Sequence, residues 1–315
     1  MEEWLSALEN SKEPAICFLY HVQILNEDEN SKANRDLQGE IKACPRVQTM
    51  LLEWASLHPY QKWRGAHWVL ALLADLGYPK CDDTLLPLRE AEFAWLLDED
   101  RIKQIPLIAG RYRRCASQEG NAVFAMVKLG LADERVDRLV ELLLGWQWPD
   151  GGWNCDKKPE AHVSSFNESL IPLRGLAAYW KIHPDEEVKR AVDRASEFFL
   201  QRQLFRRLTN HQVIRTSFTK LCYPHYWHYD ILFGLQVMSE AGKLDDPRCQ
   251  EALDRVQARQ LEAGGFPAEE KYYRVTPEVS TGASAVDWGT VSKIRANEFV
   301  SIQAWNLLKL AGRVE

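Results

Sequence analysis

The sequence predicts an all-α fold built from repeated helix pairs, and three observations support this prediction. Apolar residues recur at intervals of three and four along most of the chain, as in 67–76 and 135–145, which is the period of an α-helix. Runs of β-branched residues bounded by turn residues are nearly absent. The segment Gln147–Trp153 (QWPDGGW) has a weaker copy at Gln260–Phe266 (QLEAGGF). A repeated turn motif indicates a repeated helix-turn-helix unit.

Six predicted helix ends divide the chain at intervals of roughly 50–70 residues, which is long enough for a helix pair and its loops. Gly77, Gly130, Gly242 and Gly312 fit four of these ends, because the residue after a helix often needs a positive φ angle. The other two ends lie near Asn26 and at 182–184. Six helix pairs can stack as an open solenoid or close into a ring. The predicted inner helices are 14–25, 63–76, 117–129, 164–181, 225–241 and 293–311.

Composition limits the function. The 315 residues include twelve Trp, 46% are hydrophobic, and the net charge is −6, which is typical of a folded globular protein without the basic stripe of a nucleic-acid binder. No stretch approaches the ~20 apolar residues of a membrane span, and the first residues show no signal peptide. The seven scattered Cys indicate cytosolic thiols. We therefore expect a cytoplasmic monomer or homodimer with a small-molecule substrate.

The Gln-x-x-Asp-Gly-Gly-Trp segment, followed by a polar loop and a predicted inner helix, resembles the repeat of squalene cyclases and protein prenyltransferase β subunits. This resemblance implies a single (α/α)6 toroid over residues 1–315, with six inner and six outer helices around a central cavity. It also implies a cyclase-like enzyme that uses acid–base chemistry on a small, largely apolar or polycyclic molecule. Because fold does not determine function, the catalytic motifs of these families need a separate comparison.

Cyclases of the olefin-protonating class have an Asp-x-Asp-Asp-Thr general acid at the start of an inner helix. In this chain the equivalent segment is Ser165–Ser169, where the central acid falls on Asn167 and only Glu168 is a carboxylate. An amide cannot protonate an alkene. The run Asp82-Asp83-Thr84 matches half of the motif, but Lys80 stands where the first Asp should be. We interpret this run as a helix cap.

Protein prenyltransferases bind zinc through Asp-x-Cys and a later His. The Asp-x-Cys position falls here on Glu160-Ala161-His162, and the later His is His225 or His228. Glu and His are acceptable zinc ligands, but the thiolate is missing. Cys222 with His225 and His228 is a second candidate, because the two histidines lie one turn apart on a helix that begins at 225. Zinc is thus one cofactor to consider, while the sequence favours no cofactor.

Polar residues follow the turn motif and open the inner helices, where a cavity mouth is expected. The candidate general acids and bases are Glu168, His228, Asp156 and Asp230, with His228 oriented by Glu168 or Asp230. For Glu168 the alternative is a capping box with the Ser165 backbone. The arginines at 111, 113 and 114 either hold an anion or lie on a solvated loop. The candidate substrate-binding residues are Ser164, Ser165, Asn154, Cys155, Glu119, Trp227, Tyr226 and His67.

Three alternatives stay open beside the cyclase-like enzyme. A carbohydrate-active enzyme on an (α/α)6 plan would use Asp156 and Glu168 as its carboxylate pair. A zinc-dependent transferase or hydrolase would use the candidate ligands above. A binding protein without catalysis would expose a charged concave face. The segment 266–288 has no helical period and is expected to be a lid or an inert loop excursion.

Overall fold

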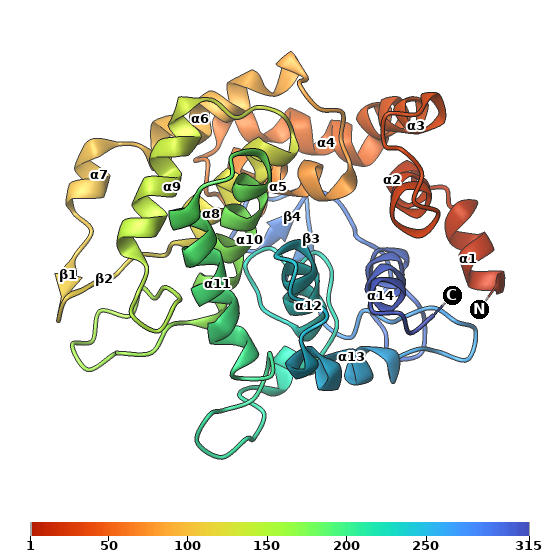
Figure 1. Ribbon diagram of the computed structural model, residues 1–315. Helices are drawn as coiled ribbons and strands as arrows, with labels where there is room; N and C mark the ends of the chain where they lie inside the picture. Colours follow the sequence, from red (N-terminus) through yellow and green to blue (C-terminus); the bar gives the residue numbers. More distant parts are fainter. Residues whose placement is uncertain (1, 315) are drawn as a thin grey trace.

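The computed structural model describes residues 2–314 and confirms that the chain is mostly α-helical (Figure 1). A π-helical turn, Tyr20–Ile24, extends α2, and the four short strands form two separate two-stranded pairs. The helices are α1 (Glu2–Glu9), α2 (Pro14–Leu19), α3 (Lys32–Ala43), α4 (Pro45–Glu53), α5 (Ala66–Leu76), α6 (Leu86–Leu96), α7 (Glu99–Lys103), α8 (Ser117–Lys128), α9 (Glu134–Trp146), α10 (Phe166–Ile182), α11 (Glu186–Leu200), α12 (Ile231–Glu240), α13 (Gln250–Gln257) and α14 (Glu298–Leu310). The strands are β1 (Leu107–Ile108), β2 (Arg111–Tyr112), β3 (Arg274–Val275) and β4 (Ala283–Ser284).

The predicted inner helices contact one another in chain order. Helix α5 packs against α2 and α8, α8 against α10, α10 against α12, and α12 against α14. Helix α14 in turn contacts α2, so the last helix of the series lies beside the first. Of the intervening helices, α3, α9 and α11 each pack on one of these helices, whereas α6 packs on both α5 and α8, and α13 on both α12 and α14. Ser11 Oγ donates to Glu298 Oε1 at 2.9 Å, which links the two ends of the described chain.

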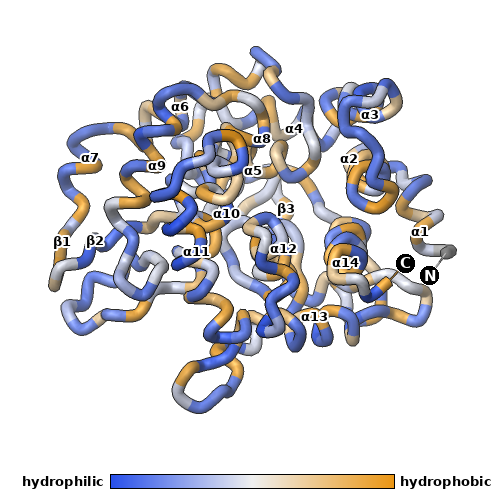
Figure 2. Tube along the Cα trace, viewed as in Figure 1, coloured by the Kyte–Doolittle hydropathy of each residue, from blue (hydrophilic) through white to orange (hydrophobic). Residues whose placement is uncertain are grey.

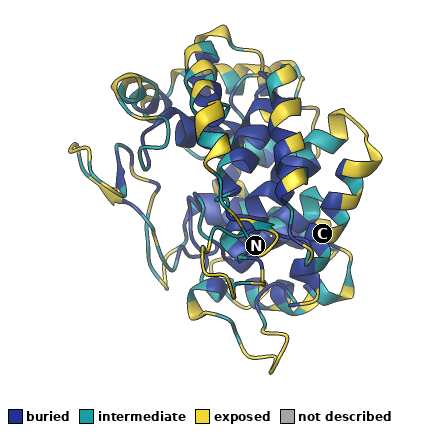
Figure 3. Ribbon diagram, turned by 90° about the vertical axis from the view of Figure 1, so that its left-hand side faces the viewer, coloured by how far each residue is buried: buried dark blue, intermediate teal, exposed yellow. Residues whose placement is uncertain are grey.

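Burial follows the amphipathic pattern of the sequence. In α11 the buried residues include Val188, Val192, Ala195 and Phe199, which recur at the spacing of one helix face. Hydrophobic and hydrophilic stretches alternate along the helices (Figure 2). Buried residues form a continuous interior, while exposed residues occupy outer helix faces and loops (Figure 3). Among residues 2–314, no helix combines the length and the hydrophobicity that crossing a membrane requires.

Four inner helices begin later than the sequence predicts, and α10 differs least, since it begins at Phe166 rather than at residue 164. Helix α5 begins at Ala66 rather than at residue 63, and α14 begins at Glu298 rather than at 293. The largest difference is α12, which begins at Ile231 because Asp230 caps it by accepting the N–H of Phe233 at 2.9 Å. The aromatic residues at 223–229 suit a helix face, but they instead pack in a non-helical turn where Tyr226 has a φ of 50°.

Both glycine-glycine turns have the same backbone hydrogen bonds. Gly151 N donates to Trp148 O and Trp148 N donates to Gly152 O; the second turn repeats this with Gly264 N to Leu261 O and Leu261 N to Gly265 O. Gly151 has a φ of +96° and Gly264 of +99°, a region that L side chains rarely adopt. The predicted repeat of the turn is therefore confirmed at the level of hydrogen bonding.

The segment 266–288 contains no helix, as predicted, and several of its residues are buried, among them Phe266, Tyr273 and Trp288. It packs against the chain that precedes α5: Trp63 Nε1 donates to Tyr272 O at 2.9 Å, and Trp63 N donates to Ala283 O at 3.0 Å. These contacts hold the segment over the N-terminal end of α5. Its movement as a lid stays a prediction.

Candidate functional site

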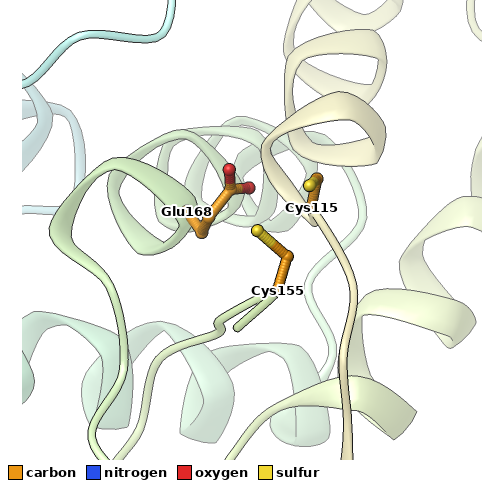
Figure 4. A group of neighbouring side chains, drawn as sticks. All are labelled: Cys115, Cys155 and Glu168. Atoms are coloured by element: carbon orange, nitrogen blue, oxygen red, sulfur yellow. The ribbon is translucent and has the colours of Figure 1, made fainter. Parts of the chain in front are cut away.

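Three side chains from separate segments converge at the N-terminal ends of α8 and α10. The thiol sulfurs of Cys115 and Cys155 and a carboxylate oxygen of Glu168 all lie within 4.8 Å of one another. Figure 4 shows the three side chains pointing toward a common centre. Cys115 precedes α8, Cys155 follows the Gly151-Gly152 turn, and Glu168 lies in the first turn of α10. We call this group the thiol–carboxylate cluster.

Close packing of α8 against α10 brings these segments together. A Cβ atom on Gly175 would lie 2.3 Å from Gly120 O, and one on Gly120 would lie 2.5 Å from the backbone of Pro172. The two backbones can approach this closely only because glycine occupies both positions. The starts of the two helices, with Cys115 on one side and Glu168 on the other, are consequently neighbours.

Glu168 is 8% exposed and has no ion-pair partner among the described residues. Its Oε2 accepts the backbone N–H of Ser117 at 3.2 Å. Burial raises the pKa of this carboxyl group, and the hydrogen bonds from Ser117 partly oppose that rise. The capping-box alternative is wrong, because Ser165 N donates to Trp153 O and not to Glu168. Glu168 is thus a buried acid that holds its proton more firmly than usual.

The two thiols are half-buried, and their sulfur atoms lie within 4.8 Å of each other. This contact raises the pKa of Cys115 and lowers the pKa of Cys155, while burial raises both pKa values. Cys155 is therefore the thiol of the pair that more readily becomes a thiolate, which is the reactive and metal-binding form. Cys155 was predicted as a substrate-binding residue, whereas Cys115 was not singled out.

Lys62 and Tyr60 also lie near the cluster, and the sequence analysis missed both. The Lys62 ammonium lies over the rings of Trp63 and Trp227, at 5.2 and 4.8 Å from their centroids. Desolvation lowers the pKa of Lys62, while the charges of Glu168 and Cys115 raise it. Burial raises the pKa of Tyr60 to about 12. No sequence signal connects 60–62 with 155–168, because only the packing of α5 on α8 brings them together.

Most of the predicted residues beside Cys155 shape the loop rather than join the cluster. Ser164 donates its N–H and its hydroxyl to Asp150. Asn154 Nδ2 donates to Val163 O at 2.9 Å. Asp156 is exposed, and its Oδ1 accepts the N–H of Lys158 at 3.0 Å. The carboxylate of Asp156 thus binds the backbone of its own loop, and its catalytic role stays a prediction.

Glu119 and His67 are buried in polar pairs of their own. Glu119 is bound by Arg114, so Arg114 is an ion-pair partner rather than a free anion-binding group. Arg113 is buried and donates to the backbone oxygens of residues 108 and 161. His67 lies 2.6 Å from Glu92 through Nδ1 and 3.2 Å from Asn121 Nδ2 through Nε2. These contacts give the starts of α5 and α8 a fixed polar arrangement.

The predicted zinc ligands do not come together as a set. His162 is exposed and contacts the backbone oxygen of Glu160. Cys222 and His225 instead form a buried group with Asp230, with donor atoms within 4.8 Å of one another. Both oxygens of Asp230 already accept backbone N–H groups, from Cys222 and Phe233. The predicted pairing of His225 and His228 on one helical face is wrong, because no helix is present there.

His228 stacks between aromatic rings. Its ring lies 3.6 Å from that of Tyr272 and 4.6 Å from that of Trp227, measured between centroids. His228 Nδ1 lies 3.3 Å from His225 O, so neither Glu168 nor Asp230 orients it as predicted. Burial lowers its pKa to about 4. Tyr226, predicted as a substrate-binding residue, is buried, and its ring is stacked on that of Trp63 with the centroids 4.0 Å apart. Its ring is therefore part of the packed aromatic interior.

Two cavities lie at the C-terminal ends of the inner helices, opposite to the thiol–carboxylate cluster. One of about 210 Å³ is lined by Phe124, Lys128 and Ile182, and one of about 200 Å³ by Asp75, Gln236 and Asn306. Both are also lined by Glu240, which holds the buried guanidinium of Arg174 at 2.8 Å. A cation such as Lys128 in the last turn of α8 is common for structural reasons, because the helix dipole favours positive charge there. These two cavities therefore lie at the end of the inner helices opposite to the thiol–carboxylate cluster, whereas a cavity of about 610 Å³ lies beside the second glycine-glycine turn, where Trp4, Leu261 and Ile294 line it.

Two comparisons with known proteins found no relative of this sequence. No protein-family model matches the sequence, and no curated protein matches it.

Proposed function

We propose that the helices close into an (α/α)6 toroid. The proposal is supported by the contacts of α2, α5, α8, α10, α12 and α14 in chain order and by the contact between α14 and α2. A ring and an open solenoid differ in their response to truncation. If the helices form a ring, deleting residues 298–315 should abolish its single cooperative unfolding transition. If they form an open solenoid, the shortened chain should keep a cooperative transition with a smaller enthalpy of unfolding. Calorimetry of the two chains distinguishes these outcomes.

We infer that this chain is an enzyme acting on a small, largely apolar molecule at the N-terminal ends of α8 and α10. The observation that carries this proposal is the environment of Glu168: a buried carboxyl group to which the described part of the chain offers no ion-pair partner, and whose pKa is raised by burial. Such groups are characteristic of general acids, although structural burial can also raise a pKa. The aromatic rings of Tyr60, Trp63 and Trp227 near the cluster favour an apolar substrate.

The proposed chemistry is proton transfer. Protonated Glu168 gives its proton to a substrate atom, and the resulting carboxylate removes a proton from a neighbouring position, so the acid is regenerated without a co-reactant. The net reaction is an isomerisation or a ring closure. The N–H of Ser117 stabilises the carboxylate between the two transfers. The turn motif shared with squalene cyclases supports this class, while Asn167 at the central acid position separates the chain from the olefin-protonating pattern.

The test uses heavy water. Terpenoid-like compounds are first screened for protection of the protein against heat, and those that protect are incubated in D₂O with wild type and Glu168→Gln. We expect deuterium at carbon in the wild-type reaction and at least ~100-fold slower incorporation in the variant. Glu160→Gln, an exposed change in the loop that precedes α10, should exchange as wild type. Protection by glycosides alone would favour a carbohydrate-active enzyme, and protection by neither class would favour a binding protein.

A further inference from the structure

We propose that the thiol–carboxylate cluster is a zinc site in which Cys115, Cys155 and Glu168 supply three ligands and the fourth position is open. The proposal goes beyond the proposed function: it shares the location at the N-terminal ends of α8 and α10 but gives Glu168 the role of a metal ligand in place of a proton donor. Zn²⁺ prefers four-coordinate sites of thiolate, imidazole and carboxylate ligands, and sites with three protein ligands keep a position for water or substrate. Two sulfurs and one carboxylate oxygen match this ligand set.

The geometry is close to that of a loaded site. With Zn–S distances of about 2.3 Å and Zn–O distances of about 2.0–2.2 Å, tetrahedral ligand atoms lie roughly 3.5–3.8 Å apart. The three donor atoms here lie within 4.8 Å of one another. Binding therefore requires shifts of about 1 Å, which rotation of the half-buried cysteine side chains supplies. All three side chains already point to one centre (Figure 4).

One oxygen of Glu168 is held in place by a neighbouring group, as is usual for metal-binding carboxylates. Oε2 accepts the N–H of Ser117 at 3.2 Å, whereas Oε1 accepts no hydrogen bond from the part of the chain that the structure describes, and this oxygen would bind the cation. The hydrogen-bonded backbone fixes the carboxyl orientation independently of any metal. The arrangement is that of a monodentate ligand with its second oxygen already satisfied.

The charge balance also fits. Two thiolates, one carboxylate and Zn²⁺ carry a net charge of −1, and Lys62 lies near enough to Glu168 and Cys115 for their charges to act on it. A single ammonium group would neutralise the loaded site. Arg114, the other cation nearby, is already paired with Glu119.

The buried group of Cys222, His225 and Asp230 is a poorer site. The two oxygens of Asp230 accept backbone N–H groups, and His225 Nε2 lies 3.3 Å from Gln303 Oε1. Its ligands are almost fully buried, so no position is left for a substrate. Hydrogen bonding within the protein explains this group without a metal, and it provides an internal comparison for the test.

The bound ion would change the role of Glu168. Zinc supplies a Lewis acid and a bound water with a lowered pKa, and Glu168 would then be a ligand rather than the proton donor. Metal content therefore separates the two mechanisms that this one cluster can support.

The test measures binding of Zn²⁺ to the full chain after removal of metals with a chelator, by competition with a chromophoric chelator, and then records the spectrum of the Co²⁺-loaded protein. We expect one zinc per chain and a thiolate-to-cobalt charge-transfer band. Cys115→Ser and Cys155→Ser should each weaken zinc binding by more than the roughly 10–100-fold effect of losing an outer partner. Cys81→Ser, which changes an exposed cysteine, is the matched control and should bind as wild type. Thermal unfolding without metal verifies that each variant is folded.

Three results would overturn the zinc proposal: absence of zinc binding, unchanged binding in both cluster variants, or loss of zinc only in Cys222→Ser. The proposed function fails separately. If zinc does not bind but Glu168→Gln abolishes deuterium incorporation, the acid–base enzyme stands without a metal. If zinc binds as expected and no apolar compound is bound or turned over, the metal site stands and the proposed substrate class is wrong.

Discussion

The hydroxyl of Ser169 accepts the backbone N–H of Trp153 at 2.9 Å and donates to the carbonyl of the same residue at 3.2 Å. Ser301 makes the same pair of contacts with Phe266, at 2.8 and 3.2 Å. In both repeats a serine in the first turns of an inner helix thus holds the aromatic residue that ends the glycine-glycine turn. In the first repeat this contact also positions the cluster, because Glu168 precedes Ser169 and Cys155 follows Trp153 by two residues.

Replacing Ser169 with Ala should destabilise the protein by about 1–3 kcal/mol, because the buried N–H of Trp153 loses its acceptor. The measurement is the free energy of unfolding in urea. Ser56→Ala, at an exposed position, is the control and should stay within about 0.5 kcal/mol of wild type. An equal effect of the two substitutions would show that the contact does not hold the turn.

Gly151→Ala should also be destabilising, and by more than Gly110→Ala. Both glycines have positive φ angles, but a Cβ on Gly151 would lie 2.2 Å from Arg194 O, whereas one on Gly110 would meet nothing within 4 Å. Backbone strain alone costs about 1 kcal/mol, and the steric overlap adds to it only in Gly151→Ala. Urea unfolding of the two variants isolates the steric part. Similar losses at both positions would contradict this explanation.

Stability should fall in acid because of His228. Its pKa is lowered to about 4 in the folded protein from the ordinary 6.5, so the unfolded chain binds a proton in this range and the folded chain does not. The contribution is fully present above pH 6.5 and is lost as the pH falls toward 4, with an upper limit of about 3 kcal/mol. His228→Phe retains the stacking and should flatten this part of the pH profile of unfolding free energy. His162→Gln, at an exposed position, should leave the profile unchanged.

The helical fold and the repeated turn could be predicted from sequence because both are local. A period of three to four residues and a glycine-glycine pair with positive φ report directly on the backbone. The start of α12 could not, since Tyr226 and its aromatic neighbours have the composition of a buried helix face. Their turn depends on contacts with Trp63, which lies more than 160 residues earlier in the chain.

The candidate site was predictable only in part for the same reason. Glu168 and Cys155 follow the turn motif, so their neighbourhood is visible in the sequence. Cys115 belongs to a different repeat, and it meets Cys155 only because Gly120 and Gly175 let α8 and α10 approach closely. His162 and Asp156 have suitable chemistry and a suitable position in the chain, but the loop turns both outward. Side-chain direction in loops is set by tertiary contacts that the pattern does not contain.

The pH dependence of Glu168 has the opposite sign to that of His228. Burial raises the pKa of Glu168 above the ordinary 4.5, so between these two pKa values the folded protein keeps a proton that the unfolded chain releases. Stability from this group is complete below pH 4.5 and falls as the pH rises through the folded pKa.

Glu168→Gln should remove this decline, so the difference in unfolding free energy between wild type and variant should shift in favour of the variant as pH rises. Exposed Glu160→Gln should show no such trend. The measurement is made in chelator. Adding zinc should make the stability of wild type and of Glu160→Gln rise with pH, but not that of Glu168→Gln, because a metal ligand must be deprotonated. A pH-independent difference between wild type and Glu168→Gln in chelator would mean that Glu168 is ionised in the folded protein, and the proton-donor role would fail with it.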